Sequence, residues 1–154
     1  MKKNKFSGFK IKNSNAFRNY ELIEKYEAGI SLAGTEVKSI VKGKANISDS
    51  YAVIKNGEAY ILNMHVSPYE FGDRDNKEPN RNRKLLLHKK EILKINQKIK
   101  EKSLSLIPTY LYMKNNKIKV ELWLGKGKKL YDKRYDLMKK EVDRKIERKL
   151  KNYR

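Results

Sequence analysis

Apolar and polar residues alternate along much of the middle of the chain, with the two-residue period of β-strands. The clearest example is at residues 51–55 and 58–62, which flank the pair Asn56-Gly57. Asn-Gly is preferred in two-residue hairpin turns because both positions need a positive φ. This segment therefore predicts a β-hairpin.

Three other stretches also have strand-like patterns. Residues 22–32 mix aromatic and aliphatic side chains, and Gly29 among them predicts a bend or bulge. Residues 106–113 and 118–124 predict a second hairpin that turns at Asn115-Asn116. Five or more antiparallel strands within about 105 residues favour a small closed or partly closed barrel with inserted helices.

Two segments follow the helical period instead. Val37, Ile40 and Val41 share one face of a short helix that Gly43 would end. Residues 85–101 predict an amphipathic helix with a basic outer face. The polar residues 67–83, which include a proline, predict a loop between these helices. The apolar side of the second helix is formed by Leu86, Ile92, Ile95 and Ile99.

The last 25 or so residues form a separate pattern, in which apolar residues recur about every four positions. This spacing predicts a helix with a narrow apolar stripe. Pairs with an acidic residue four positions before a basic one, such as Glu141 with Lys145, add only about 0.2–0.5 kcal/mol each to helix stability. That is too little to hold an isolated helix firmly. Either the stripe docks on the body, or the tail is disordered and becomes helical on a partner. The stripe consists of Tyr131, Tyr135, Met138, Val142, Ile146 and Leu150.

Charge divides the chain into a body and two ends. Its 154 residues include 38 Lys and Arg against 18 Asp and Glu, a net charge of +20 that predicts a polyanionic partner. Much of the excess lies at the ends, since the first 19 residues contain six basic groups and no acid. We therefore expect a basic N-terminal segment at 1–19, a β-barrel body at 20–125 and a basic tail at 126–154.

Composition removes several classes of protein. The chain has no cysteine, which excludes disulfide scaffolds, thiolate zinc sites and cysteine nucleophiles. No apolar run approaches the roughly 18 residues of a membrane span, and no apolar stretch follows the basic N-terminus as in a secretory signal. We expect a cytoplasmic protein that does not associate with membranes.

Residues that could carry catalysis are few. His65 and His88 lie on different predicted elements, and the chain has no phosphate-binding loop of the usual spacing. The triplet Glu36-Val37-Lys38 matches the acid-x-Lys element of some metal-dependent nucleases, but such a site also needs a second carboxylate. We expect no catalytic residues, no metal and no cofactor, with a nuclease as the less favoured alternative.

RNA binding has more support, because basic clusters occur beside tyrosines that could stack on bases. No helix-turn-helix or zinc-finger spacing occurs, which favours RNA over sequence-specific reading of DNA. These features alone also fit a generic single-stranded RNA-binding protein or a ribosome-associated barrel protein, which is one alternative. The clusters at 38–44 and 126–134 provide the candidates Lys38, Lys42, Lys44, Lys128 and Lys129.

Six motifs follow one another along the chain. They are YEAGI at 26–30, GTEVKSI at 34–40, GKANISDSY at 43–51, SPY at 67–69, RKLLLH at 83–88 and GKGKKLYDKR at 125–134. In wording and order this set resembles the SsrA-binding protein family, also called small protein B. The resemblance covers the chain from about Asn13 onward.

The resemblance implies a bacterial RNA-binding protein with an oligonucleotide-binding-type barrel and a basic tail. Proteins of that family bind the tRNA-like domain of transfer-messenger RNA, or SsrA RNA, and deliver it to stalled ribosomes in trans-translation. They stand in for the missing anticodon arm, and their tail enters the empty mRNA channel at the ribosomal RNA of the decoding centre. The implied partners are therefore transfer-messenger RNA and the ribosome, and we expect a monomer when the protein is free.

The resemblance also implies roles for individual residues. Asp132, Lys133 and Arg134 match the start of the ribosome-acting tail. Arg18 is a departure, because the family commonly has His at this position, although Arg can also stack on a base or hold a phosphate. Positions that match the family's RNA-binding surface are Glu27, Lys38, Asn46, Asp49, Tyr51, Leu86 and Lys119.

Overall fold

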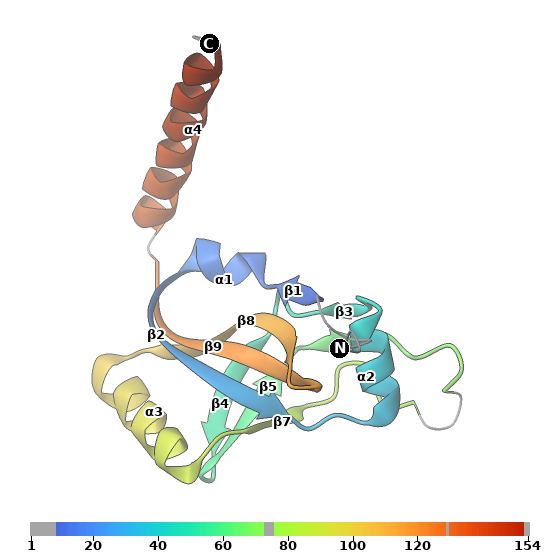
Figure 1. Ribbon diagram of the computed structural model, residues 1–154. Helices are drawn as coiled ribbons and strands as arrows, with labels where there is room; N and C mark the ends of the chain where they lie inside the picture. The colour runs from blue at the N-terminus through green and yellow to red at the C-terminus, as the bar shows by residue number, and fades with distance from the viewer. Residues whose placement is uncertain (1–8, 73–75, 129, 153–154) are drawn as a thin grey trace.

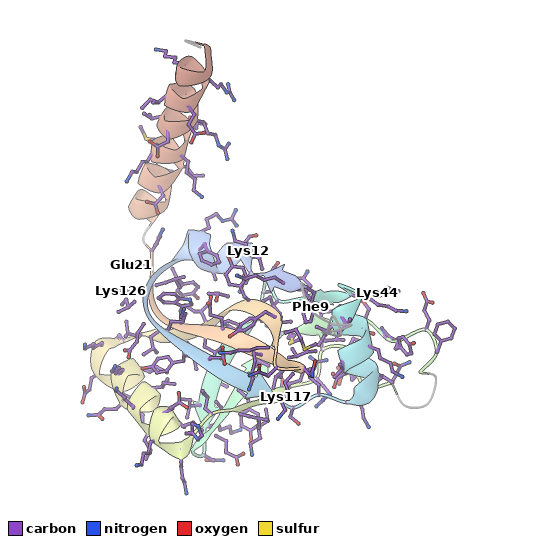
Figure 2. The ribbon with its side chains drawn as sticks, in the orientation of Figure 1. Phe9, Lys12, Glu21, Lys44, Lys117 and Lys126 are labelled. Carbon is purple, nitrogen blue, oxygen red and sulfur yellow. The ribbon has the colours of Figure 1, made fainter. Side chains whose placement is uncertain are left out.

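The computed structural model describes residues 9–72, 76–128 and 130–152 (Figures 1 and 2). Strands dominate the body, and one long helix ends the chain. In order, the elements are β1 (Lys10–Lys12), α1 (Ser14–Asn19), β2 (Tyr20–Ile30), α2 (Gly34–Val41), β3 (Ala45–Asn46), β4 (Tyr51–Lys55), β5 (Glu58–Leu62), β6 (His65–Val66), β7 (Arg83–Leu86), α3 (Lys89–Lys102), β8 (Ser105–Lys114), β9 (Lys117–Gly127) and α4 (Leu130–Asn152).

Antiparallel pairing closes most of the strands into a barrel. The main sheet has the order β1-β8-β4-β5-β7-β2-β9, and β9 pairs back onto β8. Six of these strands thus form a closed ring, with β1 added on β8, while β3 and β6 form a small separate pair. The predicted fold, mainly β with an antiparallel barrel and short inserted helices, is confirmed.

Both predicted hairpins are present. β4 and β5 turn at Asn56 and Gly57, whose φ angles are 54° and 74°. β8 and β9 turn at Asn115 and Asn116, with φ of 52° and 63°. Asn and Gly at these positions reduce the steric cost of the left-handed backbone that a two-residue turn requires.

Leu86 lies in a strand, so its predicted place in the helix was wrong. Residues 83–86 alternate between buried and exposed side chains, and α3 begins only at Lys89. β7 lies between two strands, with Leu85 opposite Ala59 of β5 and Leu86 opposite Gly29 of β2. Pairing on both edges, which a local pattern cannot reveal, overrides the helical spacing from Leu86 to the isoleucines.

Gly29 permits a close approach rather than the predicted bulge. The register of β2 against β9 shifts between Leu22 and Glu24, whereas the pairing at Gly29 is regular. A Cβ on Gly29 would lie 3.2 Å from the Cβ of Leu86. The missing side chain therefore lets β7 and Leu86 pack tightly against β2.

The N-terminal residues 10–19 are attached to the barrel through Asn13. β1 pairs with Tyr110–Tyr112 of β8, next to a register shift between Pro108 and Tyr110. The buried Asn13 side chain donates to the Pro108 carbonyl at 2.8 Å and accepts from the Ala16 amide at 3.2 Å. One amide side chain thus caps α1 and fixes it to the irregular part of β8.

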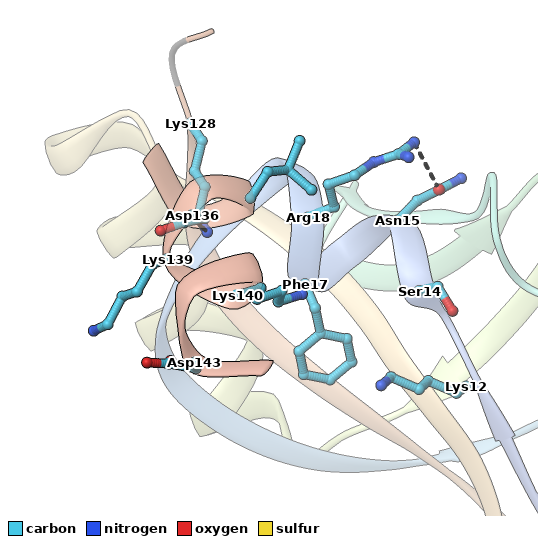
Figure 3. A pocket seen from close by; sticks show the side chains of 11 residues that line it. Lys12, Ser14, Asn15, Phe17, Arg18, Lys128, Asp136, Lys139, Lys140 and Asp143 are labelled. Atoms are coloured by element: carbon cyan, nitrogen blue, oxygen red, sulfur yellow. Dashed lines mark hydrogen bonds and ion pairs between the residues drawn. The ribbon is translucent and has the colours of Figure 1, made fainter. Parts of the chain in front are cut away.

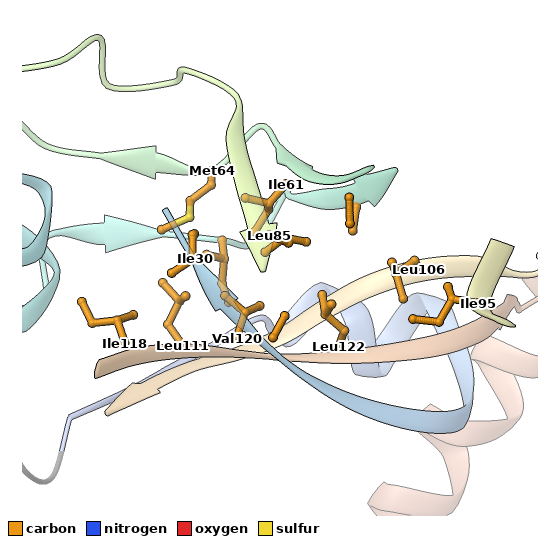
Figure 4. Packing of buried hydrophobic residues seen from close by; sticks show 14 of the residues in the cluster. Ile30, Ile61, Met64, Leu85, Ile95, Leu106, Leu111, Ile118, Val120 and Leu122 are labelled. Carbon is orange, nitrogen blue, oxygen red and sulfur yellow. The ribbon is translucent and has the colours of Figure 1, made fainter. Parts of the chain in front are cut away.

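The barrel interior is filled by aliphatic side chains from all parts of the ring (Figure 4). Ile61, Leu111 and Leu122 have no exposed surface, and Ile95 of α3 closes one end. Burial of such side chains is worth about 1.5–3 kcal/mol each. This core holds the strands that carry the candidate RNA-binding residues.

Among the residues that the structure describes, one charged side chain has no exposed surface, the guanidinium of Arg83 on β7. Its Nε donates to Glu36 of α2 at 2.6 Å, and its other nitrogens donate to the carbonyls of Met64 at 2.7 Å and Pro79 at 2.9 Å. Glu36 also pairs with Arg81 and accepts from the Ala33 amide. The network fixes α2 and the segment between β6 and β7 to the barrel.

The C-terminal tail is helical, and α4 projects away from the barrel (Figure 1). Met138, Val142 and Ile146 are 67, 54 and 51% exposed, so this part of the apolar stripe does not dock on the body. Charged residues beside a narrow stripe leave little apolar surface to bury. Within the described residues, no helix is long and apolar enough to span a membrane.

Glu36→Ala is expected to lower the free energy of unfolding by about 3–5 kcal/mol, because it leaves the buried Arg83 charge without its partner. Urea denaturation followed by circular dichroism measures this difference. Glu58→Ala is the matched control, since it breaks an exposed pair with Lys84 and should change stability little. Equal losses in both variants would contradict the structural role of the buried pair.

The pH dependence provides a second check of the same pair. Burial alone raises the pKa of Glu36, but hydrogen bonds from Arg81, the Ala33 amide and Arg83 outweigh it and hold the pKa below its ordinary value. Stability from Glu36 is therefore present above the unfolded pKa, about 4.3, and is lost as pH falls through the folded pKa. The difference in the free energy of unfolding between wild type and Glu36→Ala should therefore become smaller as the pH falls through the folded pKa of Glu36.

Candidate RNA-binding surface

The candidate residues of the body form three groups. The first lies where β2 passes between β7 and the hairpin of β8 and β9. The second lies on α2 and the turn that follows it, and the third lies beside α1. In order, the groups are Glu27, Leu86 and Lys119; Lys38, Lys42 and Lys44; and Asn46, Asp49 and Tyr51.

Gly29 brings the first group together. It lies opposite Leu86 on β7 and opposite Lys119 on β9, so these two residues flank the same point of β2. Leu86 is 54% exposed, although it is a large apolar residue. Beside it is a depression of about 350 Å³ with an apolar lining that includes Val37 of α2 and Met113 of β8. Lys119 also lines this depression, which places a cation next to an apolar surface.

Glu27 is an exposed carboxylate held by neighbouring side chains. The Tyr112 hydroxyl donates to it, and the Lys114 ammonium lies 3.3 Å from its oxygens. The Tyr112 hydrogen bond and then Lys114 lower the pKa of Glu27 despite some desolvation. Burial and the hydrogen bond to Glu27 raise the pKa of Tyr112. Glu27 is therefore ionised at neutral pH and orients a phenol and an ammonium group.

The second group places lysines over aromatic rings. Lys38 and Lys42 are four residues apart and share one face of α2. Their ammonium nitrogens lie 5.3 and 5.1 Å from the centroid of the Tyr69 ring, a cation–π distance. Lys44, just after α2 (Figure 2), pairs with Glu70 at 3.3 Å. Basic and aromatic groups thus meet between α2 and the segment after β6.

Two members of the third group, Asp49 and Tyr51, line a shallow pocket of about 240 Å³ beside α1. The Asn15 side chain of α1 donates to the Ser48 carbonyl at 3.0 Å and lies 3.5 Å from the Asp49 carboxylate. Asn46 lies outside this lining, and its side chain accepts from the Ser48 amide at 2.8 Å. Asn46 therefore shapes the turn that positions Asp49.

Lys128, near the start of the tail, is held through both its backbone and its side chain. Its amide donates to the Asn19 carbonyl at 2.8 Å, and its ammonium pairs with Asp136 of α4. Between α1 and α4 lies a cleft of about 550 Å³, and Phe17, Arg18 and Lys140 are among its lining (Figure 3). Arg18 donates to Asn15 at 3.3 Å.

The remaining tail candidates are described only in part. Arg134 is exposed on α4. Asp132 and Lys133 lie in α4, but the positions of their side chains are outside the described residues, as is Lys129 altogether.

The structure assigns Glu36 a structural role rather than the predicted alternative of a nuclease carboxylate. Both of its oxygens are engaged by Arg81 and Arg83. The ammonium of Lys38 lies over the Tyr69 ring instead of beside Glu36. The acid-x-Lys triplet therefore reflects helix packing on one side and an exposed basic face on the other.

Sequence reasoning missed Lys114 and Phe71, and it identified Tyr112 only as a tyrosine that could stack on a base, not as a partner of Glu27. Tyr112 and Lys114 hold Glu27 from 85 and 87 positions away, a contact that no local pattern announces. Phe71, which follows the SPY motif, was overlooked because it stands in a polar segment expected to be a loop. An aromatic residue in such a segment was the one signal that could have identified it.

A closed antiparallel barrel that presents lysines beside exposed aromatic and apolar side chains defines a class of protein, the oligonucleotide-binding-type RNA-binding barrels. The sequence model of one family within this class, described as SmpB protein, matches residues 10–152. The chain belongs to the SmpB family, and the resemblance noted from its motifs is confirmed.

Curated relatives agree with this assignment. The SsrA-binding protein of Carboxydothermus hydrogenoformans is 54% identical over 139 residues, covering 90% of this chain and 93% of its own. That of Desulforudis audaxviator is 57% identical over 136 residues, covering 88% and 89%. A solved structure described as "tmRNA-SmpB: a journey to the center of the bacterial ribosome" contains a similar chain. It has 43% identity and a TM-score of 0.65, and the match covers 79% of this chain and 85% of that one.

Proposed function

We propose that the protein binds SsrA RNA and brings it to ribosomes in trans-translation. The observation that carries this proposal is the family match, which extends from the start of β1 through the barrel to the end of α4. The similar chain in the tmRNA-SmpB structure supports both partners, the RNA and the ribosome. The protein then acts where ribosomes are, in the cytoplasm.

The body, residues 20–125 with the attached N-terminal segment, holds the tRNA-like domain of SsrA RNA. Lys38, Lys42 and Lys119 contact phosphates, since each presents an ammonium group next to an exposed apolar or aromatic surface. Leu86 and Tyr51 pack against bases or sugars. The remaining contacts of this surface are Glu27, Lys44, Asn46, Asp49, Lys128 and Lys129.

The basic tail, residues 126–154, acts on the ribosome. As a helix of 23 residues, α4 reaches about 35 Å, long enough to extend well beyond the body. Asp132, Lys133 and Arg134 stand in its first turns and begin the part that enters the empty mRNA channel. Basic residues along α4 contact the ribosomal RNA of the channel and the decoding centre.

We infer that the protein acts by binding and carries out no reaction of its own. The acid-x-Lys triplet of the nuclease alternative offers no free carboxylate, because Glu36 is bound by two arginines. Magnesium-dependent cleavage of RNA that disappears in Lys38→Ala would contradict this inference.

A competition experiment tests the proposed partner. Labelled transfer-messenger RNA, bulk tRNA and random single strands of equal length compete for the protein in a gel shift over a salt series. Preference for transfer-messenger RNA at every salt concentration is expected. The logarithm of the binding constant should also fall steeply with the logarithm of the salt concentration, and this slope counts the phosphate contacts. Equal affinity for random single strands would make the protein a generic binder instead.

Glu27→Arg is expected to weaken binding of the tRNA-like domain about tenfold, although it adds positive charge. A carboxylate can accept from a base edge and orient Lys114, and Arg can do neither. Gel shifts at fixed salt measure the change. The control is Glu21→Arg on the same strand, which adds the same charge away from Tyr112 and should leave binding unchanged or slightly tighter. Unchanged or tighter binding by Glu27→Arg would count against a role in recognition.

Deletion from Asp132 onward is expected to leave the affinity for free SsrA RNA within about threefold of wild type, because none of the described α4 side chains belongs to the barrel core. Rescue of ribosomes stalled on truncated messages should be abolished, since the tail supplies the ribosomal contact. The two activities are measured by gel shift and by tagging of the nascent chain. Loss of both together would place the tail within the RNA-binding body.

A further inference from the structure

Phe71 presents an apolar ring to solvent in the segment between β6 and β7, which extends beyond α2 (Figure 1). It is 75% exposed, more than any other large apolar side chain that the structure describes. Single exposed apolar residues are ordinary on protein surfaces and need no function. Phe71 differs because its surroundings are ordered and basic.

The turn that carries Phe71 is held in place by Asn76. The Asn76 side chain accepts from the Tyr69 amide at 2.9 Å and donates to the Tyr69 carbonyl at 3.0 Å, and the Gly72 amide also donates to that carbonyl. A Cβ on Gly72 would lie 2.7 Å from the Asn76 oxygen and 2.9 Å from a Thr35 methyl group of α2. The ring is thus presented by a fixed turn, so a ligand would bind with little further loss of conformational freedom.

Tyr69 supports Phe71 and fills the space between it and the lysines. The two rings meet edge to face, with centroids 5.6 Å apart and planes at 70°. The ammonium groups of Lys38 and Lys42 lie over the Tyr69 ring. The Lys42 ammonium is also 5.9 Å from the Phe71 centroid. Tyr69 is therefore already covered, while Phe71 is largely open to solvent.

The charges around this turn favour a nucleotide over an apolar protein partner. Among the described residues of the turn, the one acid is Glu70, which is paired with Lys44, while the ammonium groups of Lys38 and Lys42 lie over the Tyr69 ring. An unpaired base stacks on an aromatic ring while its phosphates meet ammonium groups. An apolar protein surface docked on Phe71 would instead remove these ammonium groups from water without compensation.

We propose that Phe71 is a stacking site for an unpaired base of bound RNA, with Lys38 and Lys42 holding the adjacent phosphates. The site deepens the proposed function and rests on it in one respect, that the natural RNA is SsrA RNA. It extends the candidate surface from α2 onto the 69–72 turn.

Fluorescence of Phe71→Trp tests the stacking directly. Single-stranded oligoadenylate should quench the new tryptophan well beyond the change in the wild type, which has only Trp123. Phe71→Ala should weaken binding of oligoadenylate and of the tRNA-like domain roughly tenfold, the range expected for one base stack. Phe71→Leu should bind as weakly as Phe71→Ala, because it restores apolar area without an aromatic face. Leu93→Ala, which removes another exposed apolar side chain on α3, should bind as wild type.

The fixed turn and the lysines supply two further variants. Asn76→Ala keeps the ring but frees the turn, and it should weaken binding by a smaller factor than Phe71→Ala. Lys42→Ala should reduce the salt slope by about one phosphate contact.

The outcomes separate this site from the proposed function. Wild type that prefers SsrA RNA, with Phe71→Trp unquenched and Phe71→Ala binding normally, overturns the stacking site alone. Quenching by oligoadenylate without any preference of wild type for SsrA RNA overturns the proposed function and supports the site. Weaker ribosome binding by Phe71→Ala without quenching by either RNA would assign Phe71 to a protein contact and overturn the stacking site.

Discussion

The contact between the Arg83 guanidinium and the Glu36 carboxylate organises the part of the surface that α2, β7 and the segment before β7 form. Arg83 stands on β7, three residues before Leu86, and its nitrogens also bind the carbonyls of Met64 and Pro79. Glu36 stands on α2, two residues before Lys38, and Lys42 is the residue that follows the last turn of this helix. A charge without exposed surface tolerates few arrangements of its partners, because each missing hydrogen bond leaves a large desolvation cost. The pair therefore fixes α2, β7 and the ends of the segment that carries Phe71 relative to one another, which aliphatic packing alone would do with less directional precision.

Local sequence chemistry predicted much of the barrel. Asn-Gly and Asn-Asn turns, and the alternation around them, identified both hairpins because these signals act over a few residues. The features that failed depend on partners distant in the chain. β7 read as the start of a helix, since its strand character comes from pairing with β2 and β5. Gly29 was predicted to mark a bend or bulge, and the close approach that it permits was missed, since the Leu86 side chain that it accommodates is 57 positions away. The attachment of residues 10–19 was likewise hidden, because Asn13 meets carbonyls of β8 that only a register shift exposes.

The candidate site divides in the same way. Lys38 and Lys42 were identifiable as part of a basic cluster, because the clustering of lysines is a local property of the sequence. Their aromatic partner Tyr69 was known as part of a motif, but its position over that face depends on the segment between β6 and β7 folding back to α2. Glu27 was known through the family alone. The physical reason to find a carboxylate there, a phenol and an ammonium group held by it, comes from the hairpin of β8 and β9 crossing the end of β2. The presence of the acidic Glu27 on the candidate RNA-binding surface is thus explained by the two neighbouring side chains that it orients.

The extended position of the tail has the opposite cause, since few contacts among the described residues hold α4 to the body. Its apolar stripe is flanked by charged residues, and the described part of the stripe remains half or more exposed, so docking of the stripe would bury little apolar area. Repulsion between like charges and weak apolar gain together keep α4 extended. Lys128 ties it to the body at its root, through the Asn19 carbonyl and Asp136. An extended helix anchored at one end leaves both the barrel surface and the tail open to polyanions, which a docked tail would not. The +20 net charge is in this sense spatially divided, and that division suits the proposed function, in which the barrel holds one RNA and the tail reaches another.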